Sequence, residues 1–168
     1  MDEARSASPS ARAHQNMSDR DAITDLVARF DDATNRRDAA EMRALWADDG
    51  VWEIMEPRPM RVDGGDRIVA TWLSMLGALD WFFRGSFAGV VSVEGDRATG
   101  RWPCVETGRF GPASDRPGQG YDNRSIYEDV YVRRDDGWVF ARRRYLYLWL
   151  SEGDLPGAGV PLGPELEG

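Results

Sequence analysis

The spacing of apolar residues changes once along the chain, from a helical period to strict alternation. Within residues 21–36 and 67–76, apolar side chains recur every three or four positions, which is the spacing of one helix face. From Asp80 to Leu150 they alternate with other residues, as in strands that bury one face. Helices followed by a meander of antiparallel strands predict an α+β domain, in which helices cover one face of a curved sheet.

The helical part predicts helices over 21–36 and 67–79, with a short helix capped by Asp38 between them. A short strand is expected over 51–55, followed by a proline- and glycine-rich loop over 56–66. The alternating part predicts four further strand segments, over 81–93, 97–110, 123–134 and 138–150.

One folded domain, residues 17–150, is expected between two tails. Residues 1–16 are rich in Ala, Ser and Arg without apolar periodicity, which predicts a disordered N-terminal tail. Residues 151–168 are rich in Gly and Pro and end with acidic residues, which predicts a C-terminal tail without regular structure.

Composition argues against several classes of partner. The formal net charge of −8 disfavours nucleic acid and anionic membranes, because both attract basic surfaces. A single cysteine rules out an internal disulfide framework, and no apolar run is long enough to span a membrane. The N-terminus lacks the apolar core of a secretory signal, so we expect a cytoplasmic protein.

Aromatic residues are numerous, with seven Trp, five Tyr and six Phe. Such a surplus suits a large core, an oligomer interface or an apolar ligand pocket. The aromatic run over 145–150 predicts a homodimer or homotrimer contact.

Asp48 and Asp49 resemble metal ligands, but no His or Cys cluster accompanies them, so neither a metal nor a cofactor is predicted.

The stretch ATGRWPCVETGRF, residues 98–110, places Trp102, Cys104 and Glu106 on one face of a strand. A cysteine nucleophile needs an activating partner, and the one histidine, His14, lies in the predicted tail. Cys104 is therefore expected to be part of a pocket wall. Glu106 has two interpretations: an acid/base group with a raised pKa in an apolar pocket, or half of an ion pair. The candidate ion-pair partners are Arg124 and Arg142.

Three segments together resemble the SnoaL-like family of the NTF2-like superfamily. They are AITDLVARFDDATNRRDAAEMRALWADDGVWEI, GDRATGRWPCVETGRF and YEDVYVRRDDGWVFARRR. The resemblance covers about residues 18–150. It implies a cone-shaped fold in which N-terminal helices and a curved antiparallel sheet enclose a pocket. Because this superfamily hosts many chemistries, the resemblance favours a fold more strongly than a reaction.

The resemblance also implies that the usual catalytic residues are missing. Dehydrochlorinase-like and dehydratase-like members pair an Asp at the end of the first helix with a His after the third helix. Those positions fall on Asn35 and on or next to Phe83. The positions that ketosteroid isomerase uses fall on Ile54 and Phe30. Neither mechanism can operate with these side chains.

The resemblance and the strand alternation together predict a pocket. Glu106, Tyr127 and Asn35 are its candidate catalytic residues. Tyr127 is alternatively a packing residue, and Asn35 alternatively caps a helix. For Asp129 a strand-edge charge or a helix-cap partner is favoured over a second polar group of the site. The predicted substrate-binding residues are Phe30, Trp52, Ile54, Trp81, Phe83, Trp102, Cys104, Asp129 and Arg144.

These features predict a small cofactor-independent enzyme of the isomerase, dehydratase or cyclase type. Its substrate would be a hydrophobic small molecule, of polycyclic, terpenoid or polyketide character, held in an aromatic pocket. The alternative is a non-catalytic module that binds a ligand or another protein, which the loss of the His–Asp pair favours. A dioxygenase β-subunit is a weaker third possibility, because nothing in the sequence marks a partner surface.

Overall fold

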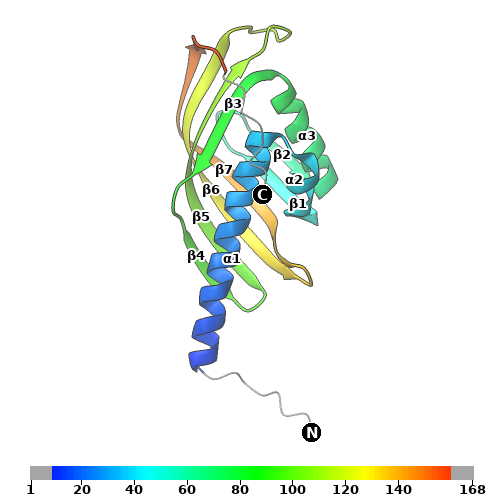
Figure 1. The fold of residues 1–168 in the computed structure, drawn as a ribbon, viewed down its shortest axis with the longest axis vertical. Coiled ribbons are helices and arrows are strands. Elements are labelled where there is room, and N and C mark those ends of the chain that lie inside the picture. Colours follow the sequence, from blue (N-terminus) through cyan, green and yellow to red (C-terminus); the bar gives the residue numbers. More distant parts are fainter. Residues whose placement is uncertain (1–8, 160–168) are drawn as a thin grey trace, which may run out of the picture.

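The structure is a computed structural model that describes residues 9–159, and in it three helices pack on one strongly curved sheet (Figure 1). The helices are α1 (Pro9–Arg36), α2 (Ala39–Ala44) and α3 (Gly65–Gly77). The strands are β1 (Trp46–Ile54), β2 (Met60–Asp63), β3 (Leu79–Ser86), β4 (Val90–Glu94), β5 (Arg97–Phe110), β6 (Gln119–Arg134) and β7 (Gly137–Asp154).

The sheet is mixed but mostly antiparallel. Its strand order is β2-β1-β7-β6-β5-β3, and β4 also pairs with β5. Only β1 and β7 run parallel within the described sheet, and a long connection from β2 to β6, which includes α3, separates them along the chain. The long strands β5, β6 and β7 form a continuous meander, as the alternating pattern predicts. The α+β prediction is confirmed.

Helix α1 has the buried face that its apolar period predicts, including Ile23, Val27 and Phe30. It begins at Pro9, however, and not at Asp21. Residues 9–16, predicted to be disordered, are therefore helical. Proline suits the first position of a helix, and Ala, Arg and Gln favour helix without any apolar period. Residues 1–8 and 160–168 of the two expected tails lie outside the described residues.

The junction between α1 and α2 follows from two residues. Arg37 adopts a left-handed backbone with φ of 59°, which ends α1. Asp38 then caps α2 as predicted, because its carboxylate accepts a hydrogen bond of 2.9 Å from the backbone N–H of Glu41. The chain therefore turns sharply and lays α2 beside the end of α1 (Figure 1).

Some strand boundaries differ from the prediction. The segment 81–93 is divided into β3 and β4, and the predicted loop 56–66 contains β2. Strand β7 continues to Asp154, so part of the predicted C-terminal tail belongs to the sheet. These extensions pair with neighbours on long strands, and such long-range pairing overrides local propensity.

A charged pair is buried in the core beneath the sheet's inner face. Arg143 and Asp129 form two hydrogen bonds, of 2.9 and 3.0 Å, and neither side chain is exposed. Tyr131 donates a third hydrogen bond to Asp129 at 2.8 Å. The Arg143 guanidinium also lies about 4 Å from the ring centres of Phe30 and Tyr127. The pair fixes the register of β6 against β7 where both are covered by α1.

Replacing one member of this pair should be costly. Asp129→Asn should lower the free energy of unfolding by about 3 kcal/mol, because Arg143 would keep its charge without a buried anion. Urea denaturation provides the measurement. The control is Glu128→Gln on the exposed face of the same strand, where the ion pair with Arg101 at 3.6 Å should contribute less than about 1 kcal/mol. Equal losses in both variants would contradict this account.

Candidate functional site

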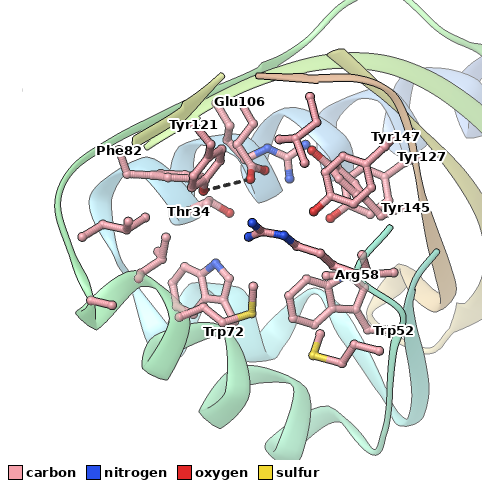
Figure 2. Close-up of a pocket in the computed structure, with 18 of the residues that line it drawn as sticks. Thr34, Trp52, Arg58, Trp72, Phe82, Glu106, Tyr121, Tyr127, Tyr145 and Tyr147 are labelled. Atoms are coloured by element: carbon pink, nitrogen blue, oxygen red, sulfur yellow. Dashed lines mark hydrogen bonds between the residues drawn. The ribbon is translucent and has the colours of Figure 1, made fainter. Parts of the chain in front are cut away.

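A cavity of about 410 Å³ lies between helix α3 and the inner face of strands β3, β5, β6 and β7 (Figure 2). Its walls are mainly aromatic and aliphatic, and they include Trp52, Trp72, Phe82 and four tyrosines. The charged residues among the described lining are Arg58, Arg84, Glu106 and Arg116. Glu106 is thus the one carboxyl group in the described wall, which makes it the first candidate for acid/base chemistry.

Glu106 lies on the inner face of β5 and points into the cavity (Figure 2). Burial raises the pKa of its carboxyl group, although the charge of Arg84 and a hydrogen bond from Tyr121 oppose this effect. The Tyr121 hydroxyl donates to Oε1 at 3.2 Å. The two arginines that the sequence offered as ion-pair partners bind elsewhere: Arg124 to Asp122 and Arg142 to Glu53.

Arg84 is a buried cation opposite Glu106. The two residues are direct partners in the β3–β5 ladder, so their side chains share one face of the sheet. Arg84 is only 2% exposed, and its Nε lies 3.1 Å from a carboxylate oxygen of Asp31. Its Nη2 has no hydrogen-bond partner among the described residues. An unpartnered donor in a cavity wall is available to an oxygen atom of a ligand.

Two residues of α1 hold the strand that carries Arg84. Asn35 makes two hydrogen bonds of 2.9 Å with the Arg84 backbone, one to its carbonyl and one from its N–H. Asp31 accepts a hydrogen bond of 2.6 Å from the Ser86 N–H. The predicted catalytic Asn35 therefore does not line the cavity, because both polar ends of its amide are used by the backbone. It is a positioning residue for Arg84.

Tyr127 lies where the prediction placed it, in the cavity wall. Two cations lie near its ring, with the guanidinium carbons of Arg143 and Arg84 at 3.9 and 5.1 Å from the ring centre. Burial raises the pKa of its phenol, which therefore stays protonated. Its hydroxyl forms no hydrogen bond with another described residue, so it can donate one to a ligand.

Several predicted wall residues are also in place. Phe30, Trp52 and Ile54 line the cavity, from α1 and β1. The indole N–H groups of Trp52 and of Trp72 on α3 are buried without partners among the described residues. In Figure 2 the Trp72 nitrogen points toward the middle of the cavity. These N–H groups add hydrogen-bond donors to an otherwise apolar wall.

Trp81 and Phe83 lie on the outer face of β3, contrary to the prediction. The register of β3 against β5 runs from Leu79↔Phe110 to Trp81↔Arg109, so Asp80 is an extra, bulged residue. One extra residue reverses the faces of all residues that follow it. Phe82 and Arg84 consequently point inward, and Phe83 is 50% exposed. The position next to Phe83 is the one that faces the cavity.

Arg144 also lies on the outer face, contrary to the prediction, and the reason is again an extra residue in the strand. In β7 the register changes from Tyr131↔Phe140 to Val130↔Arg142, which makes Ala141 a bulge. Arg144 therefore points to the outer face, 3.6 Å from a Glu53 oxygen and 3.8 Å from a Glu128 oxygen. The reversed alternation turns Tyr145 and Tyr147 into the cavity, two residues that the sequence had suggested for packing or an interface.

Trp102, Cys104 and Asp129 face inward as predicted, but they lie in the core beyond the cavity. The Trp102 indole donates to the Tyr131 hydroxyl at 2.7 Å, which links it to Asp129. Burial raises the pKa of the Cys104 thiol to about 11, so the thiolate is scarce at neutral pH. None of the three is placed to contact a ligand in the cavity.

Arg84 and Tyr121 are the main candidate site residues that the sequence analysis did not identify. Tyr121 shares an inner strand face with Tyr127, which was recognised, whereas Arg84 shares one with Phe82, which was also missed. Alternation counted back from Tyr127 along β6 predicts an inward Tyr121, since β6 has no extra residue between the two. No comparable signal identifies Arg84, because the bulge at Asp80 is invisible in the pattern.

The described residues contain neither a metal-binding cluster nor a helix suited to cross a membrane. No group of three or more His, Cys, Asp or Glu side chains there is arranged to hold a metal ion. None of the described helices combines the length and apolar character that crossing a bilayer requires.

Comparison with known proteins agrees with this architecture. Residues 15–144 match the sequence profile described as "SnoaL-like domain". No protein of curated function matches the sequence. Among solved structures, a hexachlorocyclohexane dehydrochlorinase (LinA) type 2 has a TM-score of 0.71 and 18% identity, over 89% of this chain and 95% of that one.

Two proteins from Novosphingobium aromaticivorans are also similar. A candidate scytalone dehydratase has a TM-score of 0.72 and 18% identity, over 91% of this chain and 99% of that one. An NTF2-like protein with a cystatin-like fold has a TM-score of 0.64 and 25% identity, over 86% and 92%. The NTF2-like fold is thereby established, and its named structural relatives include enzymes that catalyse eliminations.

The burial of Cys104 predicts low thiol reactivity. At pH 8 the native protein should react with a disulfide reagent such as dithiobis(nitrobenzoate) roughly 100-fold more slowly than the unfolded chain, because the thiol is both protonated and covered. The release of thionitrobenzoate with and without guanidinium chloride measures this ratio. Comparable rates in the two states would show that the thiol is accessible and ionised.

The raised pKa of Glu106 predicts a pH-dependent stability. The folded chain holds this proton more tightly than the unfolded chain, whose carboxyl titrates near the ordinary value of 4.5. The tighter proton binding therefore stabilises the folded chain fully below pH 4.5. This stabilisation is lost as the pH rises through the pKa that Glu106 has in the folded state. Glu106→Gln cannot titrate, so the stability of wild type relative to this variant should fall with pH, by up to about 1.4 kcal/mol per pH unit.

The control for this titration is Glu53→Gln. Although Glu53 is partly buried, its hydrogen bonds to Arg142 and Arg61 lower the pKa of its carboxyl. Wild type should therefore gain stability relative to Glu53→Gln as pH rises from acid, the opposite slope. Urea midpoints across the pH range give both curves. A flat difference for Glu106→Gln would mean that Glu106 has an ordinary pKa.

Proposed function

Because the chain belongs to the SnoaL-like family, we propose that its cavity is the active site of a cofactor-independent acid/base enzyme of isomerase, dehydratase or cyclase type. The observation that carries the proposal is Glu106, a carboxyl group without an ion-pair partner among the described residues, in a wall that is otherwise aromatic and cationic. A carboxyl group with a raised pKa is suited to exchange protons near neutral pH.

In this proposal Glu106 transfers the proton. Its ionised form removes a proton from a carbon atom next to a carbonyl group of the substrate. The electron pair of that C–H bond forms a C=C double bond, and the π electron pair of the carbonyl group moves onto its oxygen. Protonated Glu106 then returns the proton to another carbon, which is an isomerisation, or to a departing hydroxyl group, which is a dehydration. Poor solvation strengthens the carboxylate as a base, since water no longer stabilises its charge.

Arg84 would stabilise the negative oxygen that forms in this step. Its guanidinium is held by Asp31 and by the Asn35 clamp on its backbone, so it is oriented before the substrate arrives. A fixed, buried cation stabilises developing negative charge more effectively than mobile water does. The free hydroxyl of Tyr127 lies in the same wall and supplies a second donor.

The shape and lining of the cavity support a hydrophobic, ring-containing substrate. Trp52 and Trp72 face the tyrosine wall of β6 and β7 across the cavity (Figure 2). Flat apolar surfaces on both sides favour a polycyclic, terpenoid or polyketide skeleton. The names of two structural relatives, a dehydrochlorinase and a candidate dehydratase, denote eliminations, which also require the removal of a proton.

The proposed mechanism replaces the His–Asp pair that the family resemblance led us to look for. The helix-end position holds Asn35, which is occupied by the backbone of β3. The inward position of that strand holds Arg84, a cation that keeps its proton at neutral pH. The base must therefore come from the next strand, where Glu106 lies directly opposite Arg84.

A probe reaction tests Glu106 without knowledge of the natural substrate. The ring opening of 5-nitrobenzisoxazole begins with proton removal by a base and proceeds well with carboxylates in apolar pockets. Wild type should accelerate formation of the coloured nitrophenolate product, and Glu106→Gln should reduce that acceleration by at least about 100-fold. The rate should rise with pH through the raised pKa of Glu106. No difference between wild type and Glu106→Gln would refute the proposal.

A variant of Tyr121 tests whether its hydrogen bond to Glu106 sets the pKa of that carboxyl group. Its hydrogen bond favours the ionised form of Glu106, so Tyr121→Phe should move the rising limb of the pH–rate profile to higher pH. Tyr147→Phe is the matched control, because Tyr147 lines the same cavity and its hydroxyl binds no other described residue. A merely structural role of Tyr121 would lower the rate at all pH values without moving the limb.

A further inference from the structure

Two arginines from distant loops meet at the opening of the cavity. Arg58 lies in the loop between β1 and β2, and Arg116 lies in the loop between β5 and β6. Both side chains line the cavity although 58 positions separate them in sequence. Figure 2 shows the Arg58 guanidinium reaching into the space between Glu106 and the two tryptophans.

A single carboxylate bridges these arginines. Both donate to the same oxygen, Oε1 of Glu152: Arg58 through Nη2, and Arg116 through Nη1 at 3.4 Å. Glu152 reaches this place because it lies opposite Tyr121 in the β6–β7 ladder, on the inner face. A bulge at Leu148 sets that alternation, so Leu150 and Glu152 point inward after Tyr147.

The charges at this opening do not balance. Arg84 has its own carboxylate, Asp31, deeper in the cavity. Arg58 and Arg116 share one carboxylate, and their guanidinium groups make no further hydrogen bond to residues 9–159. Each guanidinium has five N–H donors, so most donors at the opening remain free. This local excess of positive charge stands out in a chain whose net charge is −8.

The three side chains are placed so that a ligand could replace Glu152 as the partner of the two arginines. Their exposed fractions are 44% for Arg58 and 37% each for Arg116 and Glu152, so a ligand can reach them from solvent. The Arg116 guanidinium packs on Phe110, with its central carbon 4.1 Å from the ring centre. Glu152 can swing outward without leaving an unpartnered buried charge.

From this geometry we propose that the ligand of the cavity is a hydrophobic carboxylic acid whose carboxylate binds Arg58 and Arg116 in place of Glu152. The inference rests on the proposed function and names its substrate class. The ring skeleton would fill the aromatic cavity toward Glu106, and the carboxylate would remain at the opening. Planar guanidinium groups match a planar carboxylate. Glu152 uses only one of its two oxygens for both arginines, so a ligand carboxylate that offers both oxygens could bind them better.

Matched fluorescent probes test this inference directly. 2-Anthracenecarboxylate and 2-anthracenecarboxamide share one ring system and differ in charge. Wild type should bind the carboxylate about tenfold more tightly than the amide, as measured by fluorescence anisotropy. The double variant Arg58→Gln/Arg116→Gln should lose that preference by weakening the carboxylate about tenfold while changing the amide less than about twofold.

Two further variants sharpen the result. Glu152→Gln should tighten carboxylate binding several-fold, because the competing anion is removed. Arg124→Gln removes an exposed arginine that lies outside the cavity lining, and it should change neither affinity. Equal affinities of wild type for the two probes, no binding of either probe, or a parallel loss of both in the double variant would overturn the inference.

The outcome is separable from the test of Glu106. Probe binding is measured with Glu106 intact and reports only the preference for charge at the opening. The ring opening of 5-nitrobenzisoxazole uses a neutral substrate and reports proton transfer. A chain that binds both probes equally but still requires Glu106 for that reaction would refute the carboxylate inference alone. The reverse result would refute the acid/base proposal alone.

Discussion

The alternation of side chains along the curved sheet, interrupted by single extra residues, determines what the cavity contains. Asp80 in β3 and Ala141 and Leu148 in β7 are each such an insertion in the described ladders. Every insertion reverses which residues face inward. Arg84, the Tyr145–Tyr147 pair and Glu152 all reach the cavity or its opening because of these reversals. The bulges also bend the strands, which supports the curvature seen in Figure 1.

Most of the cavity wall is apolar, but buried arginines lie in the wall and beneath it. Arg143 lies beneath it with Asp129, and Arg84 lies in its wall with Asp31. Aromatic faces surround both arginines, with Phe30 and Tyr127 contacting each. Each of these cations has an ion pair with another acid, and Glu106 has none among the described residues. Burial of Glu106 in this largely apolar wall raises the pKa of its carboxyl group, although the charge of Arg84 opposes the effect.

Much of the fold was predictable from the sequence, because apolar periodicity reports burial directly. Ile23, Val27 and Phe30 identify the buried face of α1, and Asp38 identifies the start of α2. Unbroken alternation also placed Glu106 and Tyr127 on inward faces correctly. The helical segment before Asp21 was missed because intrinsic propensity leaves no apolar pattern.

The remaining part of the site was not predictable in the same way. Trp81, Phe83 and Arg144 were placed inward, whereas one bulged residue before each turns them outward. Asn35 was recognised as important, but the sequence cannot show that its amide binds the Arg84 backbone. Contacts of this kind depend on elements 49 residues apart, and local patterns carry no information about them.

The central claim is that Glu106 is an unpaired carboxyl group that holds its proton above the ordinary range. The most direct measurement is an NMR titration of the side-chain carboxyl carbons, with the Glu106 signal assigned by its disappearance in Glu106→Gln. We expect a titration midpoint clearly above 4.5, the ordinary value for glutamate. A midpoint at or below that value would show that Arg84 neutralises the carboxylate as a permanent ion pair, and would contradict the account.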